Sequence, residues 1–358
     1  MPPVGYNFNA SKPGYRSKER GGKQRRIIIF TTLTVVLLGI LYFWGSGRDS
    51  GDDKTKSDKK GKEQYISFLP TPGQAAKSML PATKTTPARA VKEEEEEEYK
   101  LIPDTQSFPK MELVFDKAEV AYKKEEYGTA RKYCYQILDS RKVPDANALW
   151  QKTVKLLGDA NTKILFSDFP FPEKKVNYSV KANDGLRKIA MKHHTSVEAI
   201  QLSNNMKLTN FNVQLGSTYN IYAGNWEIVI SKGRRKLYLF DDKKLFKVYA
   251  IGIGKQGRTP TGMFKTGGKR KNPDWYSPQG KVSYGDPKNV LGTRWIRLNP
   301  SGKTSRKISG LGIHGTWAPE SIGKAKSNGC LRMLNKDIEE LFAILPNERK
   351  PVPVTIIK

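Results

Sequence analysis

Cysteine and histidine are both scarce in this chain of 358 residues. There are two cysteines, Cys134 and Cys330, and three histidines, His193, His194 and His314. Two cysteines cannot form a disulfide framework. No acid or cysteine stands near His193 and His194 at a spacing that suits a shared metal ion. Glycine-rich phosphate-binding patterns of the G-x-G-x-x-G or P-loop type are also missing. We therefore expect neither a metal site nor a cofactor.

Acidic residues are few beside the basic ones. The chain has 35 aspartates and glutamates against 63 lysines and arginines, which gives a net charge of +28. A basic excess of this size suits nucleic acid, an anionic membrane surface or an acidic polymer as a partner. Composition alone does not separate these three classes, so the choice depends on motifs.

Long apolar runs are limited to one stretch, residues 27–45, which carries no charge over nineteen residues. A helix of that length extends about 28 Å, close to the hydrocarbon thickness of a bilayer. The preceding residues 1–26 are strongly basic, and basic flanks stay in the cytoplasm. We therefore predict a single-pass anchor in the cytoplasmic membrane, with the rest of the chain on the periplasmic or extracellular side. A cleaved signal peptide is the alternative.

Two further segments differ sharply in composition. Residues 46–110 are rich in charge, proline and threonine, which predicts a disordered linker. Residues 111–168 instead carry apolar side chains at helical spacing, with a break at Pro144. This pattern weakly resembles a tetratricopeptide-like helical hairpin. Such a unit buries little surface alone, so we expect it to pack on a neighbour or a protein partner. Cys134 lies on its apolar stripe and is predicted to be a core thiol.

The segment that carries chemistry combines His314-Gly315-Thr316 with Ser327-Asn328-Gly329-Cys330-Leu331-Arg332. Cysteine attacks as the thiolate, and a free thiol with a pKa of about 8.5 is mostly protonated at neutral pH. His314 could take that proton. Gly329 allows a tight turn that directs backbone N–H groups at an oxyanion, while Ser327 and Arg332 add a donor and a charge. A buried structural cysteine with an unrelated histidine is the alternative.

These residues resemble the signature of the L,D-transpeptidase catalytic domain. Two earlier stretches, 257–264 and 289–295, are also similar to that family, and the resemblance covers residues 226–358. It implies a mainly-β domain in which Cys330 and His314 are catalytic, and in which the oxyanion or the substrate is bound by Gly315, Ser327, Asn328, Gly329 and Arg332. Asn328 departs from the family, where many members carry a histidine. The implied substrates are the stem peptides of peptidoglycan.

The spacing within this domain predicts short strands at 226–231, 236–240 and 246–249. A helix should follow the cysteine, capped by Asn335 and buried along the stripe Ile338, Leu341, Phe342 and Leu345. The basic and aromatic insertion at 269–288 forms either a flap over the substrate groove or an exposed loop.

Residues 176–223 have a strand–helix–helix–strand pattern. The first strand is expected at 178–181, the helices around Leu186 and after Ser196, and the closing strand at 218–222. This unit resembles a lysin motif (LysM) domain, which implies binding to glycan strands. A spacer domain without a ligand is the alternative.

The sequence therefore predicts a multidomain α+β protein that acts on peptidoglycan and not on nucleic acid. The main hypothesis is a membrane-anchored L,D-transpeptidase that cross-links stem peptides. The same chemistry could instead serve an L,D-carboxypeptidase or an enzyme that anchors proteins to the wall. A non-catalytic peptidoglycan-binding scaffold is a further alternative.

Overall fold

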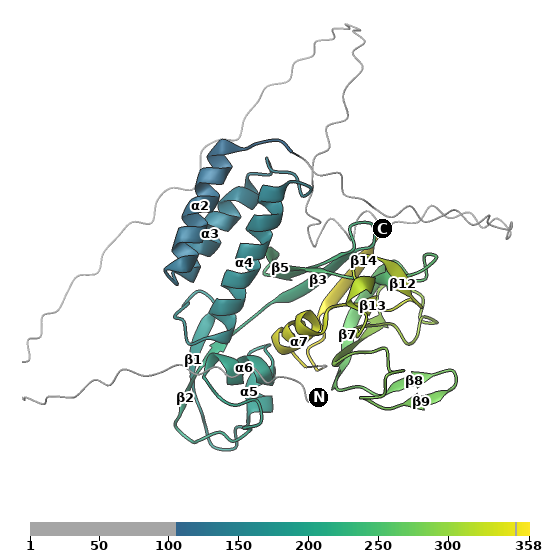
Figure 1. Cartoon of the computed structure of the whole chain (residues 1–358). Coiled ribbons are helices and arrows are strands. Elements are labelled where there is room, and N and C mark those ends of the chain that lie inside the picture. The colour runs from purple at the N-terminus through teal and green to yellow at the C-terminus, as the bar shows by residue number, and fades with distance from the viewer. Residues whose placement is uncertain (1–104, 348) are drawn as a thin grey trace, which may run out of the picture. The chain divides into compact units, whose positions relative to one another are not determined.

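The computed structural model describes residues 105–347 and 349–358 (Figure 1). The predicted basic tail, the predicted anchor at 27–45 and nearly all of the predicted linker lie outside these residues. Among the helices that the structure does describe, none is long and apolar enough to cross a bilayer.

The helical unit, residues 109–166, has three helices and not the two of the predicted hairpin. Buried alanines, among them Ala118, Ala130 and Ala160, let the helix backbones approach closely. The side chain of Asn147 accepts a hydrogen bond from the Leu149 N–H and so caps the third helix. The helices are α2 (Pro109–Lys123), α3 (Tyr127–Asp139) and α4 (Ala148–Phe166).

The following βααβ unit has the predicted order of elements and its own small core around Leu186, Ile189 and Ile200. Its two strands pair antiparallel. The predicted bounds of the first strand, 178–181, were wrong, because its backbone pairs with the closing strand from Lys175 onward. The elements are β1 (Lys175–Ser179), α5 (Leu186–Lys192), α6 (Val197–Ser203) and β2 (Thr218–Tyr222).

The C-terminal domain is built on a mixed sheet of eight strands in the order β13-β11-β10-β7-β14-β3-β4-β5. The strands are β3 (Trp226–Ser231), β4 (Lys236–Asp241), β5 (Lys244–Ala250), β7 (Gly262–Lys271), β10 (Arg294–Pro300), β11 (Gly312–His314), β13 (Leu331–Arg332) and β14 (Pro353–Ile357). Outside this sheet lie β6 (Ile253–Gly254) paired with β12 (Ala325–Ser327), β8 (Trp275–Ser277) paired with β9 (Gly280–Val282), the 3₁₀ turn η1 (Pro319–Ser321) and the helix α7 (Asn335–Ile344).

One face of this sheet packs on α7. Alternate residues of the strands, such as Ile228, Ile296 and Ile313, form a single core with Ile338 and Leu341 of the helix. The predicted buried stripe of α7 is confirmed. The prediction that Asn335 caps this helix was wrong. Leu334 is the N-cap residue, and the Asn335 side chain instead accepts a hydrogen bond from the Thr293 N–H.

The helical unit covers the other face of the sheet at β3, β4 and β5. Val229, Tyr238 and Phe240 pack against residues of α4 such as Trp150. Two side chains of the helical unit also bind backbone carbonyls of β5, the last strand in the sheet order. The Tyr135 hydroxyl donates to the Leu245 carbonyl over 2.9 Å, and Asn161 Nδ2 donates to the Phe246 carbonyl over 2.8 Å. These bonds satisfy groups that an edge strand otherwise leaves exposed, so the expected neighbour of the helical unit is this sheet.

The βααβ unit is also joined to the C-terminal domain. The Ser196 hydroxyl donates to the Ala343 carbonyl of α7, and Glu198 forms an ion pair of 2.8 Å with Lys271 of β7. Ala199 and Tyr222 belong to the core of the C-terminal domain. These contacts make the βααβ unit part of the packing around the eight-stranded sheet.

Candidate active site

The site lies where β11 and β13 run side by side. These strands pair in parallel, with Ile313 opposite Leu331 and His314 opposite Arg332. Ile313 and Leu331 are fully buried in the core. Because side chains alternate between the two faces of a sheet, His314 and Arg332 project from the opposite face. Cys330 precedes Leu331 and lies on the same side as Arg332, so the register brings the predicted nucleophile and base to one face.

The ring of His314 is held from two directions. Its Nδ1 lies 2.6 Å from the Gly315 carbonyl oxygen, and its plane stacks on Trp295 with centroids 5.8 Å apart. A carbonyl oxygen can only accept, so Nδ1 carries the proton and Nε2 is left with its lone pair. Burial lowers the pKa of His314 to about 4. The charge of Arg332 lowers this pKa further, and backbone hydrogen bonds with Gly315 and Leu291 oppose the shift. The imidazole is therefore neutral at pH 7 and can accept a proton.

Cys330 is half-buried, and its Sγ donates to the Gly310 carbonyl over 3.4 Å. Burial raises the pKa of this thiol, whereas the Gly312 backbone amide and the Arg332 charge lower it. These effects oppose one another, and burial is the largest of them, so the pKa of the thiol is raised overall.

The Cys330 loop, residues 327–330, is shaped by a glycine and a serine. Gly329 has a φ of 135°, a conformation that side-chain-bearing residues rarely adopt. The Ser327 hydroxyl accepts from the Gly329 N–H over 3.1 Å and donates to the Cys330 carbonyl over 2.6 Å. Ser327 is thus engaged inside the loop. The Cys330 N–H, in contrast, finds no acceptor within residues 105–347 and 349–358.

The other predicted site residues lie around this centre. Arg332 Nε is buried and has no hydrogen-bond partner among the residues that the structure describes. The exposed Asn328 accepts from Arg258 Nη1 over 3.3 Å. Gly315 is closely packed, since an added Cβ would lie 2.1 Å from Asn335 Oδ1 and 3.1 Å from the Thr293 N. Its carbonyl orients His314, a role that the sequence did not indicate.

The predicted insertion contains a hairpin formed by β8 and β9. Asn289, which is almost fully buried, binds the carbonyls of Pro273, Val282 and Ser283 through Nδ2 and so ties the base of the hairpin together. Tyr284, just beyond the hairpin, lies near the exposed Trp317, with ring centroids 6.3 Å apart. Trp317 follows His314 by three residues in the sequence.

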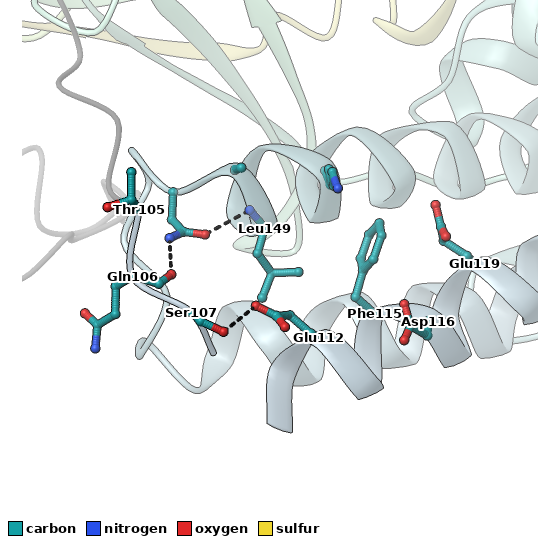
Figure 2. A pocket seen from close by; sticks show the side chains of 11 residues that line it. Thr105, Gln106, Ser107, Glu112, Phe115, Asp116, Glu119 and Leu149 are labelled. Atoms are coloured by element: carbon teal, nitrogen blue, oxygen red, sulfur yellow. Dashed lines mark hydrogen bonds between the residues drawn. The ribbon is translucent and has the colours of Figure 1, made fainter. Parts of the chain in front are cut away.

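A separate cleft of about 490 Å³ lies between the starts of α2 and α4 (Figure 2). Three acids line it, Glu112, Asp116 and Glu119. The Glu112 carboxylate accepts hydrogen bonds from the Ser107 hydroxyl and the Phe108 N–H at the start of α2, which is a capping role. None of the predicted catalytic residues lines this cleft.

Comparisons with known proteins agree with these features. Residues 225–356 match the YkuD L,D-transpeptidase catalytic domain, and residues 178–221 match the LysM domain. The L,D-transpeptidase YqjB of Bacillus subtilis is 37% identical over 128 residues, which cover 36% of this chain and 70% of that protein. The L,D-transpeptidase YkuD of the same organism is 32% identical over 177 residues, which cover 48% of this chain and 94% of that protein.

Among solved structures, the catalytic domain of an E. faecium L,D-transpeptidase acylated by ertapenem is 24% identical. The match covers 37% of this chain and 98% of that one, with a TM-score of 0.28. An L,D-transpeptidase from Mycobacterium smegmatis is 16% identical over 40% of this chain and 64% of that one, with a TM-score of 0.30.

The described fold is a mixed sheet with Cys330 and His314 at its β11–β13 end. The chain belongs to the L,D-transpeptidase family, with a LysM domain preceding the catalytic domain.

Proposed function

We propose that this protein is a membrane-anchored, cysteine-dependent L,D-transpeptidase that cross-links the stem peptides of peptidoglycan. The observation that supports the proposal is the parallel pairing of β11 with β13, which places His314 opposite Arg332, two residues beyond Cys330. Membership of the family supports the reaction class.

In the first step, Cys330 Sγ attacks the carbonyl carbon of the residue before D-alanine in a stem tetrapeptide. His314 Nε2 takes the thiol proton as the S–C bond forms. The C–N bond to D-alanine then breaks, and the imidazolium returns its proton to the departing amine. The product is a thioester on Cys330 and free D-alanine.

In the second step, the amine of another stem attacks the thioester. His314 removes a proton from that amine as the new C–N bond forms. The S–C bond then breaks, and the proton on His314 passes to the sulfur. The enzyme is restored and the two stems are joined by an amide bond.

Two groups near the sulfur are suited to the charges in these steps. The Cys330 N–H, which has no acceptor among the described residues, could donate to the tetrahedral oxyanion. The buried Nε of Arg332, unpaired among the described residues, could donate to a carbonyl or carboxylate oxygen of the stem peptide.

The LysM domain would hold glycan strands while the catalytic domain acts on their stems. Its packing against α7 and β7 supports a fixed placement of the two domains. The predicted anchor at 27–45 would keep both on the outer side of the cytoplasmic membrane. Protease added to intact spheroplasts should then digest the domain that contains Cys330. Protection of that domain would contradict the anchor.

The reaction can be tested by incubating the protein with a disaccharide-tetrapeptide and following products by mass spectrometry. Loss of D-alanine with dimer formation is the expected result, and Cys330→Ala should abolish both. Loss of D-alanine without dimers would indicate a carboxypeptidase or a transfer to protein amines. An unchanged substrate would indicate a non-catalytic wall-binding scaffold.

A further inference from the structure

Thr259 lies directly behind the Cys330 loop, on the segment between β6 and β7. Its side chain is fully buried. Oγ1 accepts a hydrogen bond from the Gly254 N–H over 2.7 Å and donates one to the Gly329 carbonyl over 2.8 Å. A hydroxyl has one proton, and the Gly254 N–H occupies a lone pair, so that proton is directed at Gly329.

The backbone of the loop is pressed closely onto β6 at this point. A Cβ added to Gly254 would lie 2.8 Å from the Gly329 Cα and 2.8 Å from the Thr259 N. Ser327 pairs with Gly254 in the short β6–β12 ladder, and the Lys255 N–H donates to the Ser327 carbonyl over 2.9 Å. The loop is thus supported by β6 and Thr259.

The hydrogen bond from Thr259 to the Gly329 carbonyl also fixes the direction of the Cys330 N–H. The Gly329 carbonyl and the Cys330 N–H belong to one planar peptide unit, and in a trans peptide these two groups point in opposite directions. Gly329, which lacks a side chain, would otherwise allow this plane to rotate. By holding the carbonyl, Thr259 points the Cys330 N–H away from β6.

We infer that Thr259 is a positioning residue that aims the Cys330 N–H at the oxyanion formed during acylation. The inference rests on the proposed function, because it assumes that Cys330 is acylated. Ser327 holds the Gly329 N–H and the Cys330 carbonyl. In this arrangement the Cys330 N–H, which has no acceptor among the described residues, is available to stabilise the oxyanion.

The test compares two reactions of the same sulfur in the full chain. Acylation by ertapenem passes through a tetrahedral oxyanion, whereas alkylation by iodoacetamide is a displacement at carbon that forms none. Thr259→Val keeps the shape of the side chain but removes both hydrogen bonds. We expect its acylation rate constant to fall about tenfold to a hundredfold, with alkylation changed by less than about twofold. Thr259→Ser should restore acylation.

The matched control is Thr266→Val. Thr266 is also a buried threonine of the C-terminal domain, and its Oγ1 accepts the Val352 N–H over 2.8 Å, away from the Cys330 loop. This variant should acylate at the rate of the unaltered protein. A similar loss of acylation in Thr266→Val would overturn the inference, since any broken buried hydrogen bond would then suffice.

The remaining outcomes separate the inference from the function on which it rests. Wild-type acylation in Thr259→Val, with none in Cys330→Ala, would overturn the inference and leave the function intact. A parallel loss of acylation and alkylation would also overturn it, because Thr259 would then support the position of the sulfur and not the amide. Acylation of Cys330→Ala at the wild-type rate would instead overturn the function.

Discussion

The two cysteines of this chain lie in regions that differ in the polar groups around the thiol. Cys134 lies on α3 and is fully buried among side chains such as Ile137 and Leu157, and burial raises its pKa to about 12. Burial also raises the pKa of Cys330, but the Gly312 amide and Arg332 act against that rise. Burial alone therefore does not separate a core thiol from a nucleophile. The two thiols differ in that neighbouring polar groups lower the pKa of Cys330, whereas burial acts alone on that of Cys134.

Removing the predicted base from the Cys330 region should have the largest effect on activity. His314→Gln should lower turnover of the disaccharide-tetrapeptide about 10²- to 10⁴-fold, because glutamine cannot take the thiol proton. His194→Gln, at an exposed histidine, is the matched control and should keep full turnover. Normal turnover in His314→Gln would mean that another group activates the thiol.

Labelling compares the two thiols directly. In the folded protein at neutral pH, iodoacetamide should modify Cys330 about a hundredfold faster than Cys134, because Cys134 is inaccessible and almost entirely protonated. Peptide mass spectrometry over time gives both rates from one sample. In denaturant the two rates should become similar. Equal rates in the folded protein would show that the surroundings of Cys330 do not raise the reactivity of its thiol.

Acid should weaken the Cys330 region through His314. The pKa of this histidine falls from 6.5 to about 4 on folding, so between these values the unfolded chain binds more protons. The contribution of a neutral His314 to stability is complete above pH 6.5 and is lost as the pH falls toward 4, at a total cost of about 3 kcal/mol. Denaturant unfolding from pH 7 to pH 4 measures this loss. His314→Gln should show a smaller decrease over the same range.

The smallest effect is expected at the other thiol. Cys134→Ala removes one buried sulfur from a packed helix interface and should lower the free energy of unfolding by about 1 kcal/mol. Turnover and the rate of acylation by ertapenem should not change. A large loss of turnover in this variant would mean that the helical unit affects the site through its contacts with β5.

Several features could be predicted from local sequence patterns. The alternation of 226–231 and the spacing of Ile338, Leu341, Phe342 and Leu345 predicted a strand and a buried helix face that the structure confirms. These patterns are readable because a strand and a helix repeat with fixed periods. The glycine-punctuated segment with Cys330 and His314 was recognisable because family resemblance is carried by adjacent residues.

Other features depend on contacts between residues far apart in the sequence. Thr259 donates to a carbonyl seventy residues away, and Asn161 binds β5 across eighty-five residues. Asn335 was expected to cap its own helix, but the fold places the Thr293 N–H against its side chain. The sequence by itself determined the family of the C-terminal domain and the strands and helix face with a clear period. Only the tertiary structure decided what holds His314 and the Cys330 loop in place, because such hydrogen bonds exist only once distant strands are packed together.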